Sequence, residues 1–316
     1  MSAGDLFEDE RITEDTAQFL RSTFAALQPL PVYLAPGNHD WFGPRSPYGR
    51  VDWSPNVCVF AEDRLTPVSL ADGVTLWGAA HRAPANTNGY LDGFRVNRGG
   101  VNLALFHGSL LGGLPREGVG KVAHAPFSDQ QIADSGLHHA FVGHFHRPST
   151  TRWHTYPGNP NPLTFGEDGS RGAVVAHVRP DGSVQVDTRA VAMAACHDLP
   201  LDVTGCVNLQ AIRTRLAGTL SGLMGVARVT LSGELAPQVD LRLADLQTVP
   251  NTLDGLVLRV GRLRVAYNFD PIRLERTARG QFVNDVAAAN LDEDDRRRVL
   301  VTGLRALEGR DDLEVL

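Results

Sequence analysis

Short apolar runs that end in loops rich in glycine, proline, asparagine or aspartate dominate the first half of this 316-residue chain. Three of these runs, at residues 31–37, 101–106 and 140–142, are almost continuously apolar. Such strands are typical of a sheet that is covered on both faces. Residues 14–27 carry apolar side chains at roughly helical spacing, which predicts a helix before the first run. The first half is therefore expected to be an α/β domain.

The pattern changes near residue 192. Ten of the eleven histidines lie before position 180. Beyond the change, the pattern predicts two helices and two strands, at residues 209–216, 292–307, 225–231 and 256–265. We therefore expect two domains, residues 1–191 and residues 192–316, of which the second is a smaller α/β domain.

The composition excludes several classes of protein. Apolar residues make up 42% and charged residues 21% of the chain, which is close to globular averages and excludes collagen-like and disordered proteins. The chain has no run of about 18 apolar residues and no recognisable signal peptide, so no membrane span is expected. Its three cysteines lack C-x-x-C spacing, which argues against a disulfide framework and favours the cytoplasm.

The net charge limits how the chain could bind phosphate groups. The formal charge is −6 at pH 7, whereas domains that bind nucleic acid through their overall field are usually basic. Phosphate binding must therefore come from a local cluster or from metal ions, whose charge can outweigh nearby carboxylates.

Polar groups stand where the apolar runs end. The four motifs are Gly4-Asp5, Gly37-Asn38-His39-Asp40, His107-Gly108 and Gly143-His144-Phe145-His146. In α/β sheets, ligands gather outside the carboxyl ends of the strands. A carboxylate, an amide oxygen and imidazoles suit Mn²⁺, Fe²⁺ or Zn²⁺ better than Ca²⁺. His144 and His146 are two positions apart on an extended segment, so both rings can reach neighbouring ions.

Each motif alone would fit a turn or a structural histidine. Four motifs in this order, three of them at strand ends, indicate a metal site. Histidines outside the motifs, such as His124 in a loop, are expected to be surface or capping residues.

The four motifs resemble the later motifs of the calcineurin-like metallophosphoesterases. Leu6-Phe7 and Tyr156-Pro157-Gly158-Asn159-Pro160 resemble more specifically the DNA repair exonuclease branch, which includes SbcD and YhaO-like proteins. Residues 282–285 and 302–307 are also similar to the C-terminal region of that branch. The resemblance implies an αββα sandwich followed by a smaller α/β capping domain.

The resemblance also implies a centre of two divalent ions. The expected ion is Mn²⁺, with Fe²⁺ or Zn²⁺ as alternatives. Asp5 would bridge both ions. Asn38, His107 and His144 would complete the coordination of one ion, and His146 would coordinate the other. Two such ions can bind a phosphodiester oxygen, lower the pKa of a water and stabilise the leaving oxygen.

Further residues are expected around the phosphate. By resemblance, His39 would act as general acid or stabilise the transition state, and Asp40 would orient its ring. Trp41 is a candidate to stack on a base, with packing beside the site as the alternative. His81 and Arg82 are candidate substrate contacts, with a structural hydrogen bond as the alternative.

The chain departs from the family pattern at its start. The family begins with Asp-x-His on an N-terminal strand, whereas only Met1-Ser2-Ala3 precedes Gly4 here. The first strand of the sandwich is therefore missing, and the ion served by His146 keeps only two protein ligands. We expect a mis-assigned start and a longer native protein, with a damaged product as the alternative. The chain as written is expected to be poorly active.

The resemblance implies a DNA exonuclease of a double-strand-break repair type complex. It also implies a homodimer, with an SbcC-like coiled-coil ATPase subunit and DNA as partners. One alternative is a phosphodiesterase that acts on small molecules. The other is an inactive, metal-poor protein that only binds DNA or a partner ATPase.

Overall fold

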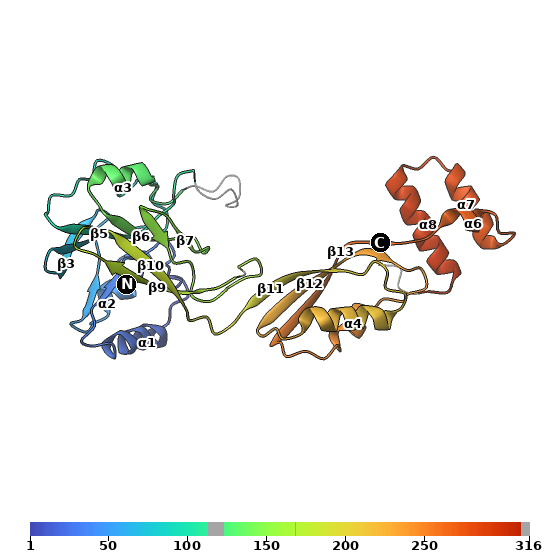
Figure 1. The fold of residues 1–316 in the computed structure, drawn as a ribbon, viewed down its shortest axis with the longest axis horizontal. Coiled ribbons are helices and arrows are strands. Elements are labelled where there is room, and N and C mark those ends of the chain that lie inside the picture. Colours follow the sequence, from blue (N-terminus) through green and yellow to red (C-terminus); the bar gives the residue numbers. More distant parts are fainter. Residues whose placement is uncertain (113–122, 168, 311–316) are drawn as a thin grey trace. The chain divides into compact units, whose positions relative to one another are not determined.

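The computed structural model describes residues 1–112, 123–167 and 169–310, which divide into two compact units (Figure 1). Unit 1 comprises Met1–Asn161 and Ser170–Ala192. Unit 2 comprises Pro162–Gly169 and Met193–Leu316. Each unit has hydrophobic clusters of its own, so the two are described separately.

The described part of unit 1 contains ten strands and three helices. The strands are β1 Val32–Leu34, β2 Val57–Val59, β3 Thr66–Ala71, β4 Val74–Gly78, β5 Val101–His107, β6 His139–Gly143, β7 Ser149–Thr150, β8 His154–Tyr156, β9 Gly172–Val178 and β10 Val184–Ala190. The helices are α1 Glu14–Ala25, α2 Pro47–Arg50 and α3 Asp129–Ser135. Six strands form a mixed sheet in the order β3-β4-β5-β6-β8-β7, while β1-β2 is a parallel pair and β9-β10 an antiparallel hairpin.

Strand β5 shows why the sequence of unit 1 is so apolar. All seven of its residues are buried, and it runs parallel to both β4 and β6. Leu103 and Leu105 pack on the side of β1, whereas Ala104 and Phe106 pack on the side of Ile132 in α3. Successive side chains of a strand point to opposite faces, so a sheet covered twice needs no polar face. The predicted α/β class and mixed sheet are confirmed.

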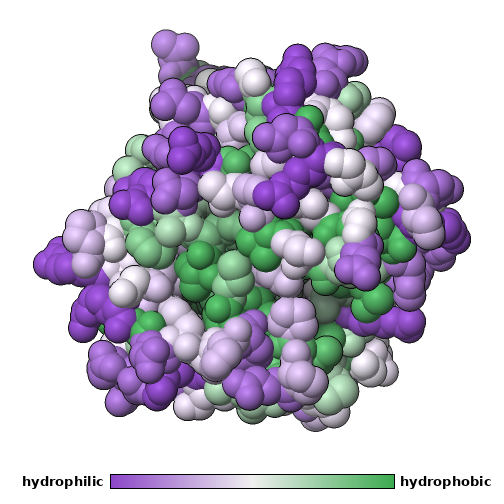
Figure 2. Space-filling model, turned by 90° about the vertical axis from the view of Figure 1, so that its left-hand side faces the viewer, coloured by the Kyte–Doolittle hydropathy of each residue, from purple (hydrophilic) through white to green (hydrophobic). Residues whose placement is uncertain are grey.

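Helices cover the sheets of unit 1 on opposite sides, with α3 above and α1 below in Figure 1. Helix α3 begins with a capping box between Ser128 and Gln131 and ends at Gly136, whose φ of 85° suits glycine. Helix α1 begins at Thr13, whose side chain accepts the backbone N–H of Thr16. Figure 2 shows a central apolar area bordered by hydrophilic side chains on one face of the molecule.

The loops that carry the motifs leave the same edge of unit 1. In the parallel pair β5-β6, His107 is the register partner of Gly143. Strand β1 ends at Leu34, which forms a parallel bridge with Ser2. The carboxyl ends of parallel strands meet at one edge, so the chain brings Asp5 and its partners together there.

Unit 2 alternates strands and helices before a helical end. Its elements are β11 Cys196–Asp202, α4 Leu209–Leu220, β12 Val226–Leu235, α5 Leu243–Gln247, β13 Gly255–Val265, α6 Phe269–Arg273, α7 Ala278–Ala288 and α8 Glu293–Leu307. The three strands are parallel, and α4 buries Ile212, Leu216 and Leu220 in the core. The predicted helices and strands beyond residue 192 are confirmed. Among the helices of the described residues, none is long and apolar enough to span a membrane.

Candidate metal centre

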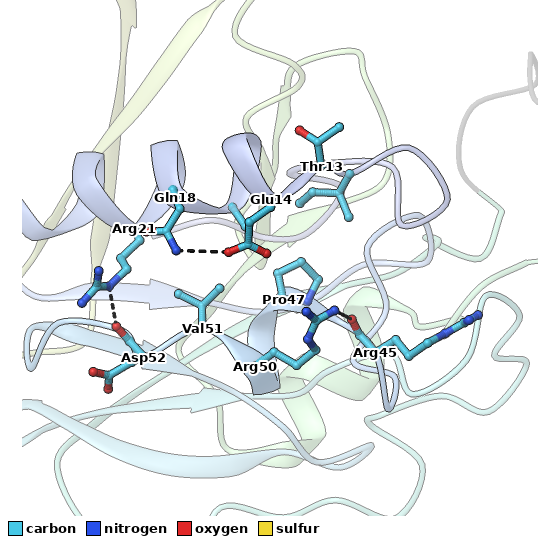
Figure 3. Close-up of a pocket in the computed structure, with 11 residues that line it drawn as sticks. Thr13, Glu14, Gln18, Arg21, Arg45, Pro47, Arg50, Val51 and Asp52 are labelled. Atoms are coloured by element: carbon cyan, nitrogen blue, oxygen red, sulfur yellow. Dashed lines mark hydrogen bonds between the residues drawn. The ribbon is translucent and has the colours of Figure 1, made fainter.

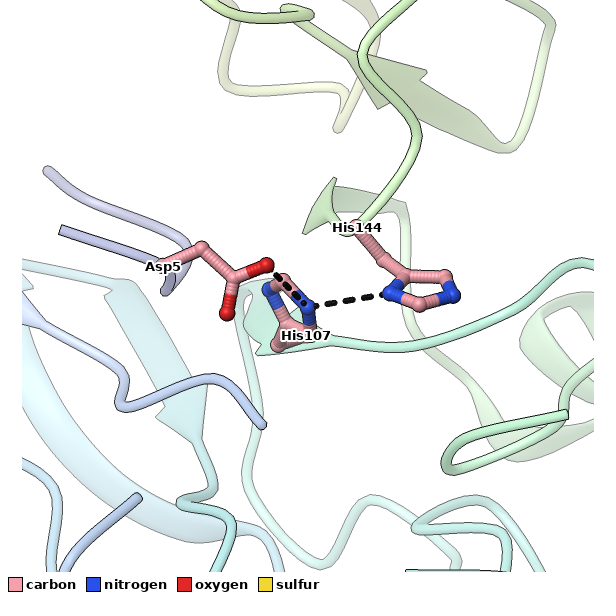
Figure 4. Close-up of side chains that lie close together, drawn as sticks. All are labelled: Asp5, His107 and His144. Atoms are coloured by element: carbon pink, nitrogen blue, oxygen red, sulfur yellow. Dashed lines mark hydrogen bonds and ion pairs between the residues drawn. The ribbon is translucent and has the colours of Figure 1, made fainter. Parts of the chain in front are cut away.

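Three predicted metal ligands from distant parts of the chain meet at the edge of the sheet (Figure 4). One ligand atom each of Asp5, His107 and His144 lies within 4.8 Å of the others. The Nε2 atom of His107 is 3.2 Å from Asp5 Oδ2 and 3.2 Å from His144 Nδ1. Asn38 Oδ1 is 3.0 Å from the same nitrogen, so four of the predicted ligands surround one point.

Glycines allow the loops of the centre to approach one another. A Cβ on Gly4 would lie 2.6 Å from His107 Nδ1, and a Cβ on Gly143 would lie 1.9 Å from the carbonyl oxygen of Ala3. Asp5 and His144 themselves have positive φ angles, of 55° and 104°. Non-glycine residues in such conformations cost free energy and cluster at functional sites.

Backbone contacts fix the orientation of His107. Its Nδ1 lies 2.8 Å from the carbonyl oxygen of Ala3, which can only accept, so Nδ1 carries the proton. When the ring is neutral, Nε2 carries a lone pair that faces the oxygens of Asp5 and Asn38. A cation satisfies this convergence of lone pairs, and a histidine ligand held through its other nitrogen is typical of metal sites. The residues therefore fit a divalent ion.

The pKa values of Asp5 and His144 favour the protonation states that bind a cation. Burial acts to raise the pKa of Asp5, but the hydrogen bond and charge of His107 and the backbone N–H of His39 outweigh it and bring the pKa to about 2. Burial, followed by the positive charge of His107, lowers the pKa of His144 to about 3. An ionised carboxylate and a neutral imidazole are the forms that bind metals.

Asp40 holds the two loops of the centre together. Its Oδ1 accepts the backbone N–H groups of Asp5 at 3.0 Å and of Gly37 at 2.6 Å. Its Oδ2 accepts the N–H of Leu6 at 2.8 Å and the hydroxyl of Tyr48 at 2.6 Å. The side chain is fully buried, and burial raises its pKa more than the hydrogen bonds lower it. Asp40 therefore positions the loops of Asp5 and Gly37. The family resemblance had implied that it orients the ring of His39.

Glu8 orients His39. The Nδ1 atom of His39 lies 3.0 Å from Glu8 Oε2, and both side chains are about half exposed. Burial acts to lower the pKa of His39, but Glu8, Asp5 and Asp40 together raise it above its ordinary value. The sequence analysis missed Glu8, although an acidic residue three positions after Asp5 was a visible signal.

The remaining predicted residues lie outside this group. His146 is exposed, and its carbonyl oxygen accepts hydrogen bonds from Arg171 and from the backbone of Asn159. Trp41 is half-buried. Arg82 and His81 each make a structural hydrogen bond, which was the alternative to a substrate contact. Arg82 donates to the carbonyl oxygen of Ala61 at 2.7 Å. His81 is completely buried, and its Nε2 is 2.9 Å from the carbonyl oxygen of His107.

His124 is a further residue that the sequence analysis misplaced. It was expected to be a surface or capping residue, but it is half-buried, and its ring centre is 5.5 Å from that of His144. Burial, followed by the charge of His107, lowers its pKa. No spacing in the sequence links His124 to the motifs, so only the fold could reveal this neighbour.

A pocket of about 280 Å³ lies apart from the metal centre, beside α1 and α2 (Figure 3). Three arginines line it, Arg21, Arg45 and Arg50. Arg21 donates to the carbonyl oxygen of Asp52 at 2.8 Å. None of the predicted site residues is among those that line this pocket.

The fold and the donor set fit a metal-dependent phosphoesterase domain. Residues 1–148 match the family described as Calcineurin-like phosphoesterase, so this part of the chain is similar to a calcineurin-like metallophosphoesterase domain. A curated relative, the uncharacterized metallophosphoesterase YhaO of Bacillus subtilis (strain 168), is 25% identical over 232 residues. The match covers 70% of this chain and 55% of the relative, so the chain spans about half of that relative's length.

These similarities agree with the metallophosphoesterase resemblance of the motifs. The family indicates metal-dependent hydrolysis of phosphoesters. The narrower assignment to the DNA repair exonuclease branch stays a prediction.

Proposed function

We propose that the chain is a metal-dependent DNA exonuclease. The observation that carries the proposal is the meeting of Asp5, Asn38, His107 and His144 around one point. His39, whose backbone N–H donates to Asp5 Oδ1 at 3.1 Å, adds an imidazole beside this group. DNA as the substrate rests on the motifs that resemble the exonuclease branch, and the ion of choice is Mn²⁺.

Asp5, Asn38, His107 and His144 would hold one divalent ion, and Asp5 and His146 would serve the second. Bound there, such ions would supply Lewis-acid polarisation of the phosphate and would lower the pKa of the attacking water. Other groups of the chain fix the positions of these metal-ligating side chains. Asp40 does so by fixing two loops, and the carbonyl of Ala3 does so by fixing the tautomer of His107.

His39 completes the reaction as general acid. Glu8 accepts a hydrogen bond from Nδ1 of His39, so Nε2 is the ring nitrogen that faces the substrate. As the bond between phosphorus and the leaving oxygen breaks, His39 Nε2 gives its proton to that oxygen. The raised pKa of His39 keeps a larger fraction of the ring protonated near neutral pH.

The proposal extends to partners and location only by resemblance. We propose a homodimer that works with an SbcC-like coiled-coil ATPase subunit in the cytoplasm. Unit 2 would act as the capping domain that meets DNA or this partner.

The test compares substrates and variants of the purified chain with added Mn²⁺. End-labelled duplex DNA should be shortened from its ends, and His107→Ala and His144→Ala should abolish the activity. Hydrolysis of cyclic nucleotides without shortening of DNA would instead favour the small-molecule phosphodiesterase. Failure to bind Mn²⁺, together with failure to hydrolyse either substrate, would favour the protein that only binds a partner.

A further inference from the structure

Four imidazole rings form a closed circle at the metal centre. The ring centres are 5.1 Å apart for His107 and His144, 5.5 Å for His144 and His124, 6.1 Å for His124 and His81, and 5.5 Å for His81 and His107. His107 and His144 form the inner pair, because a nitrogen of each lies within 4.8 Å of a carboxylate oxygen of Asp5 (Figure 4). His81 and His124 form an outer pair behind them.

The backbone places His124 firmly. Its carbonyl oxygen accepts the N–H of Ser109 at 2.8 Å, and its own N–H donates to the hydroxyl of Ser109 at 3.1 Å. The next residue, Ala125, is completely buried and has a φ of 38°. A non-glycine residue in this conformation persists only when its surroundings hold it, so the ring of His124 starts from a fixed point.

His144 is a ligand that needs such support. Its φ of 104° is unusual for a side chain with a Cβ, and it directly follows the end of β6. The ring of His107 crosses its own at 75°, and the ring of His124 crosses it at 62°. The ring of His144 is thus in edge contact with both, which limits how it can turn away from Asp5.

The contact made by His124 is one of ring packing. Its Nδ1 is buried and has no hydrogen-bond partner among the described residues. Its ligand atoms also lie outside the group that Asp5, His107 and His144 form. A buried nitrogen without a partner costs free energy, so a hydrogen bond at Nδ1 does not explain why a histidine ring stands here.

We infer that His124 is a positioning residue of the metal centre, whose ring holds the ring of His144 with Nδ1 toward His107 and Asp5. This inference rests on the proposed metal centre and deepens it. Partners that orient metal ligands through hydrogen bonds typically change metal affinity by 10–100-fold when they are replaced, and for a ring that orients its neighbour by packing we expect the lower end of this range.

The experiment measures Mn²⁺ affinity of the metal-stripped full chain by titration calorimetry. His124→Ala should weaken the affinity by about tenfold or more, whereas His124→Phe, which keeps a ring, should stay within about threefold of the starting chain. His177→Ala is the matched control, because His177 lies on the exposed face of the β9-β10 hairpin. It should leave the affinity unchanged.

Thermal unfolding of the metal-free variants separates positioning from folding. Equal Tm values together with a tenfold loss for His124→Ala support the inference. If His124→Ala fails to fold, His124→Leu replaces it in the comparison with His124→Phe. Unchanged affinity without the ring would overturn the inference, and so would an equal loss in His124→Phe, which would make the nitrogen itself a ligand. Absence of Mn²⁺ binding in the unmodified chain would instead overturn the metal centre itself.

Discussion

Replacing Glu8 by Gln tests how His39 is prepared to give up a proton. In the folded chain, Glu8 accepts from His39 at 3.0 Å and helps to raise its pKa. A raised histidine pKa favours the protonated ring, so the acid form is fully present at low pH and is lost as pH rises through the folded pKa. Glu8→Gln should therefore move this loss to lower pH.

The size of the shift follows from exposure. The side chains of His39 and Glu8 are 51% and 58% exposed, so solvent screens their attraction. Exposed pairs of this kind contribute about 0.2–1 kcal/mol. Since one pKa unit corresponds to about 1.4 kcal/mol, the alkaline limb of the pH–rate profile should move down by roughly 0.1–0.7 pH units.

The assay compares two leaving groups. The profile of kcat/KM is recorded with DNA, whose leaving oxygen needs a proton, and with bis(p-nitrophenyl) phosphate, whose nitrophenolate leaves without one. Glu8→Gln should shift the DNA profile and spare the nitrophenyl ester. Glu10→Gln, at an exposed acid two positions away, is the control. An unmoved alkaline limb in Glu8→Gln, or an equal shift in Glu10→Gln, would refute the reasoning.

Three further variants test other parts of the site. Asp40→Ala should lower the free energy of unfolding by about 3 kcal/mol in urea titrations, because it leaves the loop N–H groups of Asp5 and Gly37 without their acceptor. Gly143→Ala should weaken Mn²⁺ binding in calorimetry, because its Cβ would meet the carbonyl oxygen of Ala3, whereas Gly99→Ala, where a Cβ meets open space, should leave the binding unchanged. Arg171→Met should speed amide hydrogen exchange around His146, whose carbonyl it holds.

The strand pattern and the motifs predicted the frame of the site. The apolar runs became β1, β5 and β6, because strands buried on both faces must be apolar throughout. Their polar residues met at one edge, because parallel strands end together. Asn38, His107 and His144 could therefore be placed near Asp5 from sequence order alone.

Contacts that depend on tertiary packing could not be predicted in the same way. His81 follows a strand just as His107 does, yet it is completely buried and supports the backbone of His107. His124 reaches the centre from a loop whose path no local pattern sets. Asp40 was expected to orient the ring of His39, but its carboxylate accepts hydrogen bonds from four donors in three other segments.

Anomalous diffraction from crystals of the full chain grown with Mn²⁺ tests the metal centre most directly. An anomalous peak should lie among Asp5 Oδ2, Asn38 Oδ1, His107 Nε2 and His144 Nδ1, at coordination distance from each, and it should vanish in His107→Ala. A peak at any other place, or a Mn²⁺-saturated crystal with no peak among these four atoms, would contradict it.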